Sequence, residues 1–173
     1  MVLLFRFIGA LIVGSFQPRI EAFDETIVRM RVWPNDLDLN LHASSGRYIS
    51  FMDAARVAML VRFGAFGKVI RRGWRPVVGG TIITYRRSLL LFERMTIRSR
   101  IICWDDKWFY MEHAIERANG ELVTKARVRA TFKSREGTVP PRELARVAGH
   151  REIESPPLPE WVKHWAQADP LEK

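Results

Sequence analysis

Alternating apolar and polar positions mark five segments of the chain as strands. In the first, residues 27–33, apolar side chains at 28, 30 and 32 alternate with arginines at 29 and 31, which predicts a strand with one buried face. Four further strands are expected at residues 77–87, 95–104, 108–117 and 121–133. Asn119-Gly120 lies between the last two, and this pair is a strong hairpin signal because both residues tolerate positive φ.

The last of these strands also carries a prediction about its two faces. Three apolar side chains are expected to point inward: Leu122, Ala126 and Val128. Four are expected to point outward: Val123, Lys125, Arg127 and Arg129. The alternation predicts that one side of this strand faces the core and the other faces water.

Between residues 44 and 63 the apolar spacing changes to that of a helix. Tyr48, Met52, Ala55 and Met59 recur at helical intervals, with serines before them and Gly64 after them as boundary signals. The apolar stripe is broad, so we expect this helix to be covered on more than one side. A short second helix is expected at residues 66–72.

The order of elements predicts an α+β fold. A sheet with one apolar face needs cover, and the one long apolar helix is the element able to supply it. We therefore expect a curved antiparallel sheet of about five strands wrapped around one long central helix. The chain has 173 residues, which is long enough for a single domain with a buried core.

The two ends of the chain differ in composition from this central part. We expect an apolar N-terminal segment at residues 1–24, the folded domain at 25–150 and a proline-containing tail at 151–173 that ends in a short helix. Residues 1–16 are almost all apolar, yet a spanning helix needs about 20 residues. Three interpretations stay open for them: a packed helix, an anchor on the membrane surface, or a weak signal-like sequence.

Composition excludes some classes of site. The single Cys103 excludes an intramolecular disulfide and a cysteine cage, and the four histidines lack metal-binding spacing, so we expect no metal site. The thiol fits a reducing compartment, and we expect a cytoplasmic protein, with membrane association through the N-terminal segment as an addition. The net charge of +9 suggests anionic partners such as coenzyme A, nucleic acid or an acidic membrane.

Most of this charge is expected on the solvent face of the sheet. The residues are Arg29, Arg31, Arg98, Arg100, Lys125, Arg127 and Arg129. Glu112 and Glu116, on a neighbouring strand, are expected to pair with some of them. Nucleic acid is disfavoured because the aromatic residues near 104–109 cluster at one hairpin and do not alternate with a basic groove.

The stretch DLDLNLHASSGRY, residues 36–48, concentrates polar groups before the central helix. Asp38 lies near the helix N-terminus, whose free N–H groups favour anions and developing oxyanions, so it is a candidate nucleophile or general base. His42 is a candidate for orienting substrate or moving protons. The alternative for each is structural, and for Asp36 the structural role of a turn former is the favoured one.

These residues also carry a resemblance to a known family. The string D-x-D-x-x-x-H-x-x-x-x-x-Y resembles the loop of the hotdog-fold thioesterases of the 4-hydroxybenzoyl-CoA type. Three longer stretches resemble the branch of the superfamily named for its member six: NLHASSGRYISFMDAARVAML, YRRSLLLFERMTIRSR and WDDKWFYMEHAIER. The similarity covers roughly residues 28–133 and the SPPLPEW segment of the tail.

The resemblance implies a hotdog fold with Asp38 as the catalytic carboxylate and His42 as the family's histidine. It also pairs an acidic residue with an arginine on the helix, which corresponds to Asp53 and Arg56. The chain departs from the pattern at two places. Serines 44 and 45 replace paired asparagines, and Leu41 replaces a glycine.

Substrate contacts are expected from residues around this loop and on the strand after the helices. They are Ser44, Ser45, Gly46, Tyr48, Gly79, Gly80, Arg86 and Arg87. Gly46 leaves the first helical turn open to a ligand, and the two arginines are the candidates for phosphate. For the Gly79-Gly80 pair, a simple bulge and a backbone approach to a partner's site both stay open.

The function expected from these features is an acyl-CoA thioesterase, with coenzyme A as part of the substrate and no separate cofactor. Acyl carrier protein stays open as the carrier, as does the acyl-chain length. The resemblance implies a homodimer, or a dimer of dimers, joined at sheet edges. One alternative is a catalytically weak or inactive membrane-associated acyl-binding protein. A hydratase is disfavoured because its D-x-N-P-x-H pattern differs in register by one residue.

Overall fold

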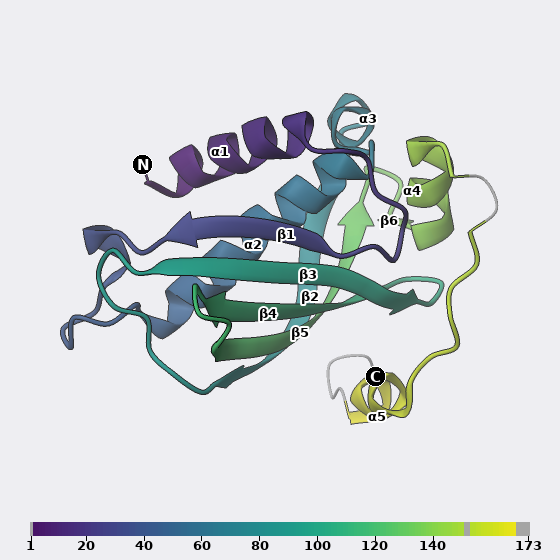
Figure 1. Cartoon of the computed structure of the whole chain (residues 1–173). Helices are drawn as coiled ribbons and strands as arrows, with labels where there is room; N and C mark the ends of the chain where they lie inside the picture. The colour runs from purple at the N-terminus through teal and green to yellow at the C-terminus, as the bar shows by residue number, and fades with distance from the viewer. Residues whose placement is uncertain (1, 151–152, 169–173) are drawn as a thin grey trace.

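The computed structural model describes residues 2–150 and 153–168 and has the expected α+β hotdog architecture (Figure 1). One antiparallel sheet has the strand order β1-β3-β4-β5-β2, with β6 paired to β5. The strands are β1 (Thr26–Arg31), β2 (Arg75–Tyr85), β3 (Arg94–Trp104), β4 (Phe109–Arg117), β5 (Leu122–Lys133) and β6 (Thr138–Val139). The helices are α1 (Val2–Phe16), α2 (Ser45–Arg62), α3 (Phe66–Arg71), α4 (Pro141–Ala148) and α5 (Glu160–Ala168).

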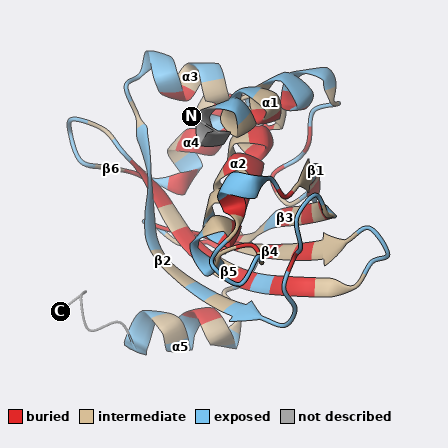
Figure 2. Cartoon of the chain, turned by 90° about the vertical axis from the view of Figure 1, so that its left-hand side faces the viewer, coloured by how far each residue is buried: buried red, intermediate tan, exposed pale blue. Residues whose placement is uncertain are grey.

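The long helix α2 occupies the concave side of the sheet and is covered on two sides, as its broad apolar stripe predicts (Figures 1 and 2). Ala54, Ala55 and Ala58 are buried, and these small side chains let the neighbouring elements approach closely. On the other side α1 lies along α2. A Cβ at Gly14 of α1 would be 3.3 Å from the carbonyl oxygen of Ala58.

A buried ion pair connects α1 to the loop before α2. The Arg6 guanidinium donates to both carboxylate oxygens of Asp36, at 2.7 and 2.5 Å, and Asp36 is 0% exposed. The Trp33 N–H also donates to this carboxylate, at 2.8 Å. Arg6 lies over the ring of Phe51 on α2, 4.6 Å from its centroid. The arginine that interrupts the apolar N-terminal segment is therefore a packing element of the fold.

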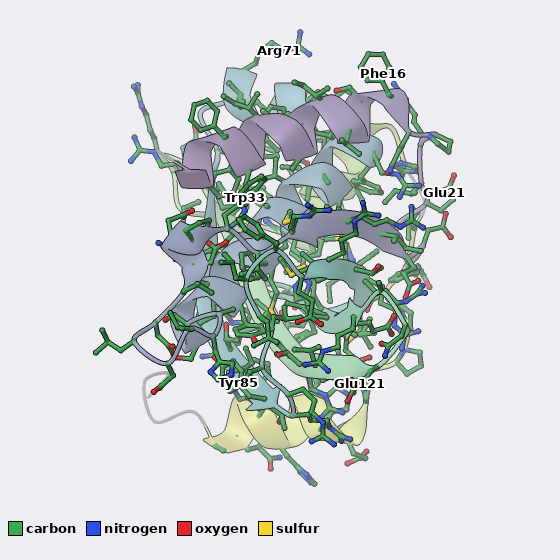
Figure 3. All side chains as sticks on the ribbon, turned by 60° about the vertical axis from the view of Figure 1, so that its left-hand side comes forward. Phe16, Glu21, Trp33, Arg71, Tyr85 and Glu121 are labelled. Carbon is green, nitrogen blue, oxygen red and sulfur yellow. The ribbon has the colours of Figure 1, made fainter. Side chains whose placement is uncertain are left out.

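The other side of α1 carries apolar residues that no described element covers. They are Phe5, Ile8, Ile12, Val13 and Phe16. Phe16 points away from the protein body at the end of the helix (Figure 3). In the described part of the chain, no helix has the length and apolar character needed to cross a membrane.

Two predictions about the faces of β5 are wrong. Val123 is buried in the core, whereas Leu122 is only half-buried. The pairing with β4 explains the difference, because it shifts register: Ile115 is opposite Thr124 and Glu116 is opposite Leu122. No residue of β4 lies opposite Val123 at this bulge, and the bulge turns the Val123 side chain inward.

Arg129 differs from the expected solvent-facing residue. It is 5% exposed, because Trp165 of α5 packs against it, and α5 lies below the strands in Figure 1. Its guanidinium lies over the rings of Trp108 and Trp165, 5.0 and 5.5 Å from their centroids. An isolated strand pattern cannot reveal a cover that comes from the C-terminal tail.

The expected cross-strand charge pairs are present on the same face. Glu112 on β4 accepts from Arg100 on β3 and Arg127 on β5, at 3.2 and 3.5 Å. Glu116 accepts from Arg98 at 3.0 Å. These pairs are partly exposed, so each contributes little to stability.

Replacing Arg6 with methionine is expected to lower the free energy of unfolding by about 3 kcal/mol, because it leaves the buried Asp36 carboxylate without its cationic partner. Chemical denaturation measures this change. Arg100→Met, which breaks an exposed pair, is the matched control and should cost about 0–1 kcal/mol. Equal effects of the two substitutions would contradict the structural role of Arg6.

Candidate functional site

The two aspartates of the loop have opposite environments. The buried carboxylate of Asp36 binds Arg6, and its carbonyl oxygen accepts the N–H of Ser44 at 2.8 Å, next to the start of α2. Asp36 therefore has a structural role, which is the role that the sequence favoured for it. Asp38 is exposed. Only Asp38 can therefore present a carboxylate to a ligand from solvent.

Asp38 is held by the loop itself. Its Oδ1 accepts the N–H groups of Asn40 at 2.9 Å and His42 at 3.3 Å. Its backbone N–H donates to the His42 carbonyl at 2.8 Å, which closes the loop. Within the described chain, Oδ2 forms no further hydrogen bond. One carboxylate oxygen is thus fixed while the other stays free to act on water or substrate.

His42 joins the loop to the chain before β3. Its backbone forms a bridge with Leu90, and its imidazole is partly exposed. The large apolar side chains of Leu39, Leu41 and Leu90 are exposed around the loop. The carboxylate and imidazole therefore lie on an apolar rim, the kind of surface that an acyl group or another copy of the protein would cover.

The start of α2 is less tightly capped than its serines suggest. Ser44 is the residue before the first turn, but its side chain makes no capping hydrogen bond. Ser45 and Gly46 are exposed, and a Cβ at Gly46 would meet no atom within 4 Å. The Arg47 N–H already donates to the Ser44 carbonyl at 2.9 Å, whereas the N–H groups of Ser45 and Gly46 form no hydrogen bond within the described chain. These two are the donors that an oxyanion would use.

Tyr48 connects the helix start to two other elements. Its hydroxyl accepts the N–H of Leu89 at 3.1 Å, and burial raises its pKa. Its ring packs edge-on against Tyr85 at the end of β2, with 5.4 Å between centroids. The Tyr85 hydroxyl donates to the carbonyl of Ser45 at 3.0 Å, so the end of β2 is fixed against the start of α2. A substrate contact by Tyr48 stays a prediction.

Gly79 and Gly80 lie at a bulge in β2, where the register with β5 shifts. A Cβ at Gly79 would be 2.3 Å from the ring of Trp108, and a Cβ at Gly80 would be 3.0 Å from Trp165. The close approach that requires these glycines therefore comes from tryptophans of the same chain. Their expected contact with substrate stays untested.

Arg86 and Arg87 follow β2 and are both exposed. The Arg87 side chain donates to Glu121 at 3.1 Å. The backbone N–H groups of both arginines donate to the Val123 carbonyl, which fixes where the two side chains begin. Arg86 is thus the better placed of the two to meet a phosphate from solvent.

A polar chain crosses the core beneath the middle of α2, from a half-exposed Asp53 to the buried Ser99 and His113, and sequence reasoning missed half of it. Arg56 binds Asp53 on the same helix and approaches His113 Nε2 at 3.2 Å. His113 Nδ1 lies 2.7 Å from the Ser99 hydroxyl. Burial, with the nearby Arg56 charge, lowers the pKa of His113 to about 3. Neutral His113 therefore accepts from Arg56 at Nε2 and donates from Nδ1 to Ser99.

The resemblance pointed to Asp53 and Arg56, but nothing in the alternation of β3 and β4 identified Ser99 and His113 as their partners. Both occupy inward positions that an apolar residue would ordinarily fill. A polar residue at an inward position of each of two adjacent strands was the available signal.

A cavity of about 290 Å³ lies between the C-terminal half of α2 and the sheet. Its walls come mainly from apolar residues of α2 and four strands, including Leu60, Phe63, Val78, Phe109, Met111 and Ala130. Asp53 and Arg56 are also in the wall. No group of three or more metal-ligating side chains occurs within residues 2–150 and 153–168.

Comparison with known proteins identifies the family. The sequence pattern of the thioesterase-like superfamily matches residues 32–166, which is most of the chain. The chain belongs to the thioesterase-like superfamily.

Individual relatives agree with this assignment. The chain is 36% identical over 162 residues to Protein THEM6 of Xenopus laevis, covering 91% of this chain and 76% of that protein. The fold is similar to that of the YbaW probable thioesterase from Escherichia coli, with a TM-score of 0.64, 21% identity, and coverage of 74% and 98%. SAV2348 from Staphylococcus aureus, in complex with CoA, gives a TM-score of 0.66 at 15% identity, with coverage of 84% and 96%.

Leu41 departs from the family pattern in a way that the backbone explains. Its φ is +59°, in the left-handed region that favours glycine, and the resemblance places a glycine at this position. The leucine side chain is 71% exposed, so packing does not compensate for the strain. The loop that holds Asp38 is thus strained at the residue before His42.

Leu41→Gly is expected to raise the free energy of unfolding by about 0.5–1 kcal/mol, since relief of left-handed strain outweighs the added freedom of the unfolded chain. Thermal or chemical denaturation measures the change. Leu39→Gly, at an exposed neighbour without positive φ, should instead lower stability by about 0.5–1 kcal/mol. A loss of stability in both variants would show that Leu41 is not strained.

Proposed function

We propose that the protein is an acyl-CoA thioesterase in which Asp38 is the catalytic carboxylate. The observation that carries this proposal is an exposed carboxylate on a tight loop directly before the central helix of a thioesterase-like chain. The apolar rim around the loop suits a substrate whose acyl group is apolar better than one whose acyl group is polar.

In this mechanism the free oxygen of Asp38 deprotonates a water molecule, or attacks the thioester carbonyl itself. In the second route the C–S bond breaks as the thiolate leaves, and water then hydrolyses the acyl–Asp38 anhydride to the free acid and the aspartate. In the first route the water oxygen bonds to the carbonyl carbon, and the carbonyl oxygen becomes an oxyanion. The exposed N–H groups at Ser45 and Gly46 stabilise that charge. The oxyanion then collapses, the C–S bond breaks, and the leaving thiolate takes up the proton.

Coenzyme A is the proposed carrier, as part of the substrate. SAV2348 has a similar fold and was determined in complex with CoA, and this chain has exposed Arg86 near the end of β2 to bind a phosphate. His42 is proposed to orient the substrate or to pass a proton from Asp38 to the leaving thiolate, because it shares the loop with Asp38. No separate cofactor is part of the proposal.

A homodimer joined at β2 is proposed as the active form. This strand lies at a free edge of the sheet, and Figure 2 shows it mostly exposed. It is 11 residues long and exposes Val77, Val78 and Ile82. A long apolar edge of this kind invites pairing with a second strand. A further pairing of dimers stays open.

Asp38→Asn is expected to lower kcat for acyl-CoA hydrolysis by about 100-fold or more, because the amide cannot act as base or nucleophile. Release of free thiol across acyl-CoAs of increasing chain length measures turnover. Binding of an S-alkyl-CoA thioether should change little, since the amide keeps the shape of the side chain. Asp24→Asn, at another exposed aspartate, is the matched control. Full turnover in Asp38→Asn would remove Asp38 from the mechanism.

A second candidate function is an acyl-binding protein that acts at a membrane surface. The observation that favours it is the uncovered apolar side of α1, with Phe16 and the basic Arg71 on the same side of the molecule (Figure 3). Apolar side chains flanked by positive charge suit an anionic bilayer surface. This surface and the Asp38 loop are compatible with each other, so membrane binding does not exclude turnover.

Ile12→Ser is expected to weaken partition onto vesicles containing phosphatidylserine by about tenfold, since it removes one apolar side chain from the contact. Vesicle co-sedimentation measures partition. Ile82→Ser, at a residue of similar exposure on β2, is the control and should leave partition unchanged. Absence of partition, or an equal loss in both variants, would refute the proposed membrane surface.

A further inference from the structure

We propose that the rim of the Asp38 loop and the turn before β3 form one surface that inserts into an anionic lipid bilayer, so that the substrate reaches Asp38 from the membrane. This surface, the insertion patch, consists of Trp33, Leu39, Leu41, Leu90, Leu91 and Phe92. The inference rests on the proposed thioesterase function and names its substrate class, which is long-chain thioesters held in a bilayer.

The insertion patch is continuous, although its residues come from three segments of the chain. The ring of Phe92 packs edge-on against that of Trp33, with 5.9 Å between centroids. Leu90, two residues before Phe92, forms a backbone bridge with His42 of the Asp38 loop. The patch therefore extends from the end of β1, across the turn before β3, to the loop that carries the candidate carboxylate.

The side chains of the insertion patch are all apolar and exposed. Trp33 and Phe92 are 47% and 49% exposed, and Leu39 is completely exposed. Soluble proteins rarely gather large apolar side chains on one part of the surface, and such a gathering marks a place of contact with a partner or a membrane. The patch therefore needs an occupant that is itself apolar.

Backbone strain falls on the same surface. Among the residues that the structure describes, two that are not glycine have positive φ: Leu41 at +59° and Phe92 at +61°. The Glu93 N–H donates to the Leu90 carbonyl at 3.1 Å, so Phe92 is the third residue of a tight turn, where positive φ favours glycine. Glycine would relieve the strain at both positions, so folding stability does not account for these two large side chains.

Positive charge lies beside the aromatic end of the insertion patch. Arg31 and Arg94 are directly opposite each other on β1 and β3, and neither forms an ion pair with a described residue. Like charges in this arrangement destabilise a sheet. The buried Val32 separates Arg31 from Trp33 along extended backbone, so the arginine and the indole lie on the same face. Cations beside aromatic rings suit the surface of an anionic bilayer.

A second copy of the protein is a poorer occupant than a bilayer. A two-fold interface joins the same surface of both copies, and here it would bring Arg31 and Arg94 of one copy toward those of the other. Glu93, beside Arg94, is already bound by Arg117 at 2.9 Å. The net charge of the chain is +9, so an anionic lipid supplies the counter-charge that a second copy lacks.

The insertion patch also adjoins the first turns of α1. Arg6 of α1 and the Trp33 N–H donate to the same carboxylate oxygen of Asp36, at 2.5 and 2.8 Å. Figure 3 shows Trp33 close to α1, and Phe5 on this part of the helix is exposed. A bilayer that contacts Phe5 can therefore also reach Trp33. Membrane contact then extends from α1 to the rim of the Asp38 loop.

The position of the insertion patch beside Asp38 connects membrane contact to the proposed reaction. Each CH₂ group that enters a bilayer adds to the partition free energy, so a long-chain thioester is held in the membrane with its carrier at the surface. Leu39 and Leu41 flank the candidate carboxylate in sequence and are exposed with it. Insertion of these side chains brings Asp38 to the bilayer surface, where the thioester group lies.

Phe92→Gly tests the apolar contact without disturbing the fold, because glycine suits the positive φ of this turn. Chemical denaturation is expected to show stability equal to the wild type or higher. Partition onto phosphatidylcholine vesicles that contain phosphatidylserine should fall at least tenfold in co-sedimentation, since an exposed ring is lost from the contact. Ile82→Ser, at a residue of equal exposure on β2, should leave partition unchanged.

Trp33→Ser is the second variant for the same contact, and it should weaken partition to a similar degree. Unchanged partition in Phe92→Gly and Trp33→Ser would overturn the insertion patch. An equal loss in the Ile82→Ser control would also overturn it, because the effect would then not be specific to this surface.

Arg31→Gln and Arg94→Gln test the contact with anionic headgroups. Each is expected to weaken partition onto the phosphatidylserine-containing vesicles about fivefold and to leave partition onto pure phosphatidylcholine unchanged. Arg135→Gln, in the turn between β5 and β6, is the matched control for net charge. If all three substitutions had the same effect, the contact would depend on net charge alone, and the patch would lose its cationic flank.

Fluorescence quenching tests whether Trp33 enters the bilayer. Wild-type protein bound to vesicles of acyl-chain-brominated lipid is expected to lose a larger fraction of its tryptophan emission than Trp33→Phe, because bromine quenches an indole that it touches. Trp33→Phe keeps an apolar ring in the patch and stays bound. Equal fractional quenching of the two bound proteins would show that Trp33 stays outside the bilayer and would refute the insertion.

Turnover separates this inference from the proposed function. Phe92→Gly should lower hydrolysis of palmitoyl-CoA presented in the vesicles at least tenfold and leave hydrolysis of acetyl-CoA in water within about threefold, because only the long chain comes from the bilayer. An equal loss with both substrates would contradict delivery from the membrane.

The two proposals fail in different ways. If the wild type hydrolyses no thioester, the thioesterase proposal fails and substrate delivery fails with it, while partition and quenching still decide the bilayer contact. If thioesters are hydrolysed but the wild type does not bind vesicles, the insertion patch fails and the function stands. A smaller sedimentation mass for Phe92→Gly, without vesicle binding by the wild type, would assign the patch to a second copy instead.

Discussion

The buried pair between Arg6 and Asp36 is the interaction on which the arrangement of the site depends. It joins three pieces of chain that are separate in the sequence: α1, the loop before α2, and Phe51 within α2. A buried carboxylate without its cation would be costly, so α1 and the loop are coupled in stability. The carbonyl of Asp36 also holds the N–H of Ser44, and this bond sets where α2 begins.

A second polar system, buried except for the half-exposed Asp53, lies in the middle of the core. The chain Asp53–Arg56–His113–Ser99 runs from α2 to two strands. It lies between an apolar cluster under the first half of α2 and another under the second half, where the cavity is. Satisfied polar networks specify one packing arrangement because an alternative would leave their groups unpaired. The helix is thereby held in one register over the sheet.

The regular elements were predictable from the sequence because each has a strong local pattern. The five main strands and α2 end within two residues of their expected positions. The faces of β5 were less predictable, since a bulge reverses the direction of Val123 and a distant helix covers Arg129. Both errors come from tertiary contacts that a single strand does not encode.

The candidate site was predictable in part for the same reason. The loop pattern made Asp38 and His42 candidates, and their roles stay predictions. The partner of Asp36 could not be found from the sequence, because Arg6 lies 30 residues away within an apolar segment. Likewise, His113 looked like one of four scattered histidines until the sheet placed it beneath Arg56. Residues adjacent in sequence can be interpreted from spacing, but partners brought together by the fold cannot.

The neighbouring aspartates have opposite environments, one that suits stability and one that suits the proposed chemistry. Two residues apart in a loop with a tight turn, Asp36 is directed into the protein and Asp38 toward solvent. Burial removes Asp36 from reaction because Arg6 and the Trp33 N–H occupy its oxygens. The role proposed for Asp38 needs the opposite, and its carboxylate has one oxygen fixed by the amides of the loop and one left free. Because Asp36 holds the loop in place through its buried ion pair, Asp38 can stay exposed. The strained backbone at Leu41 can persist beside it for the same reason.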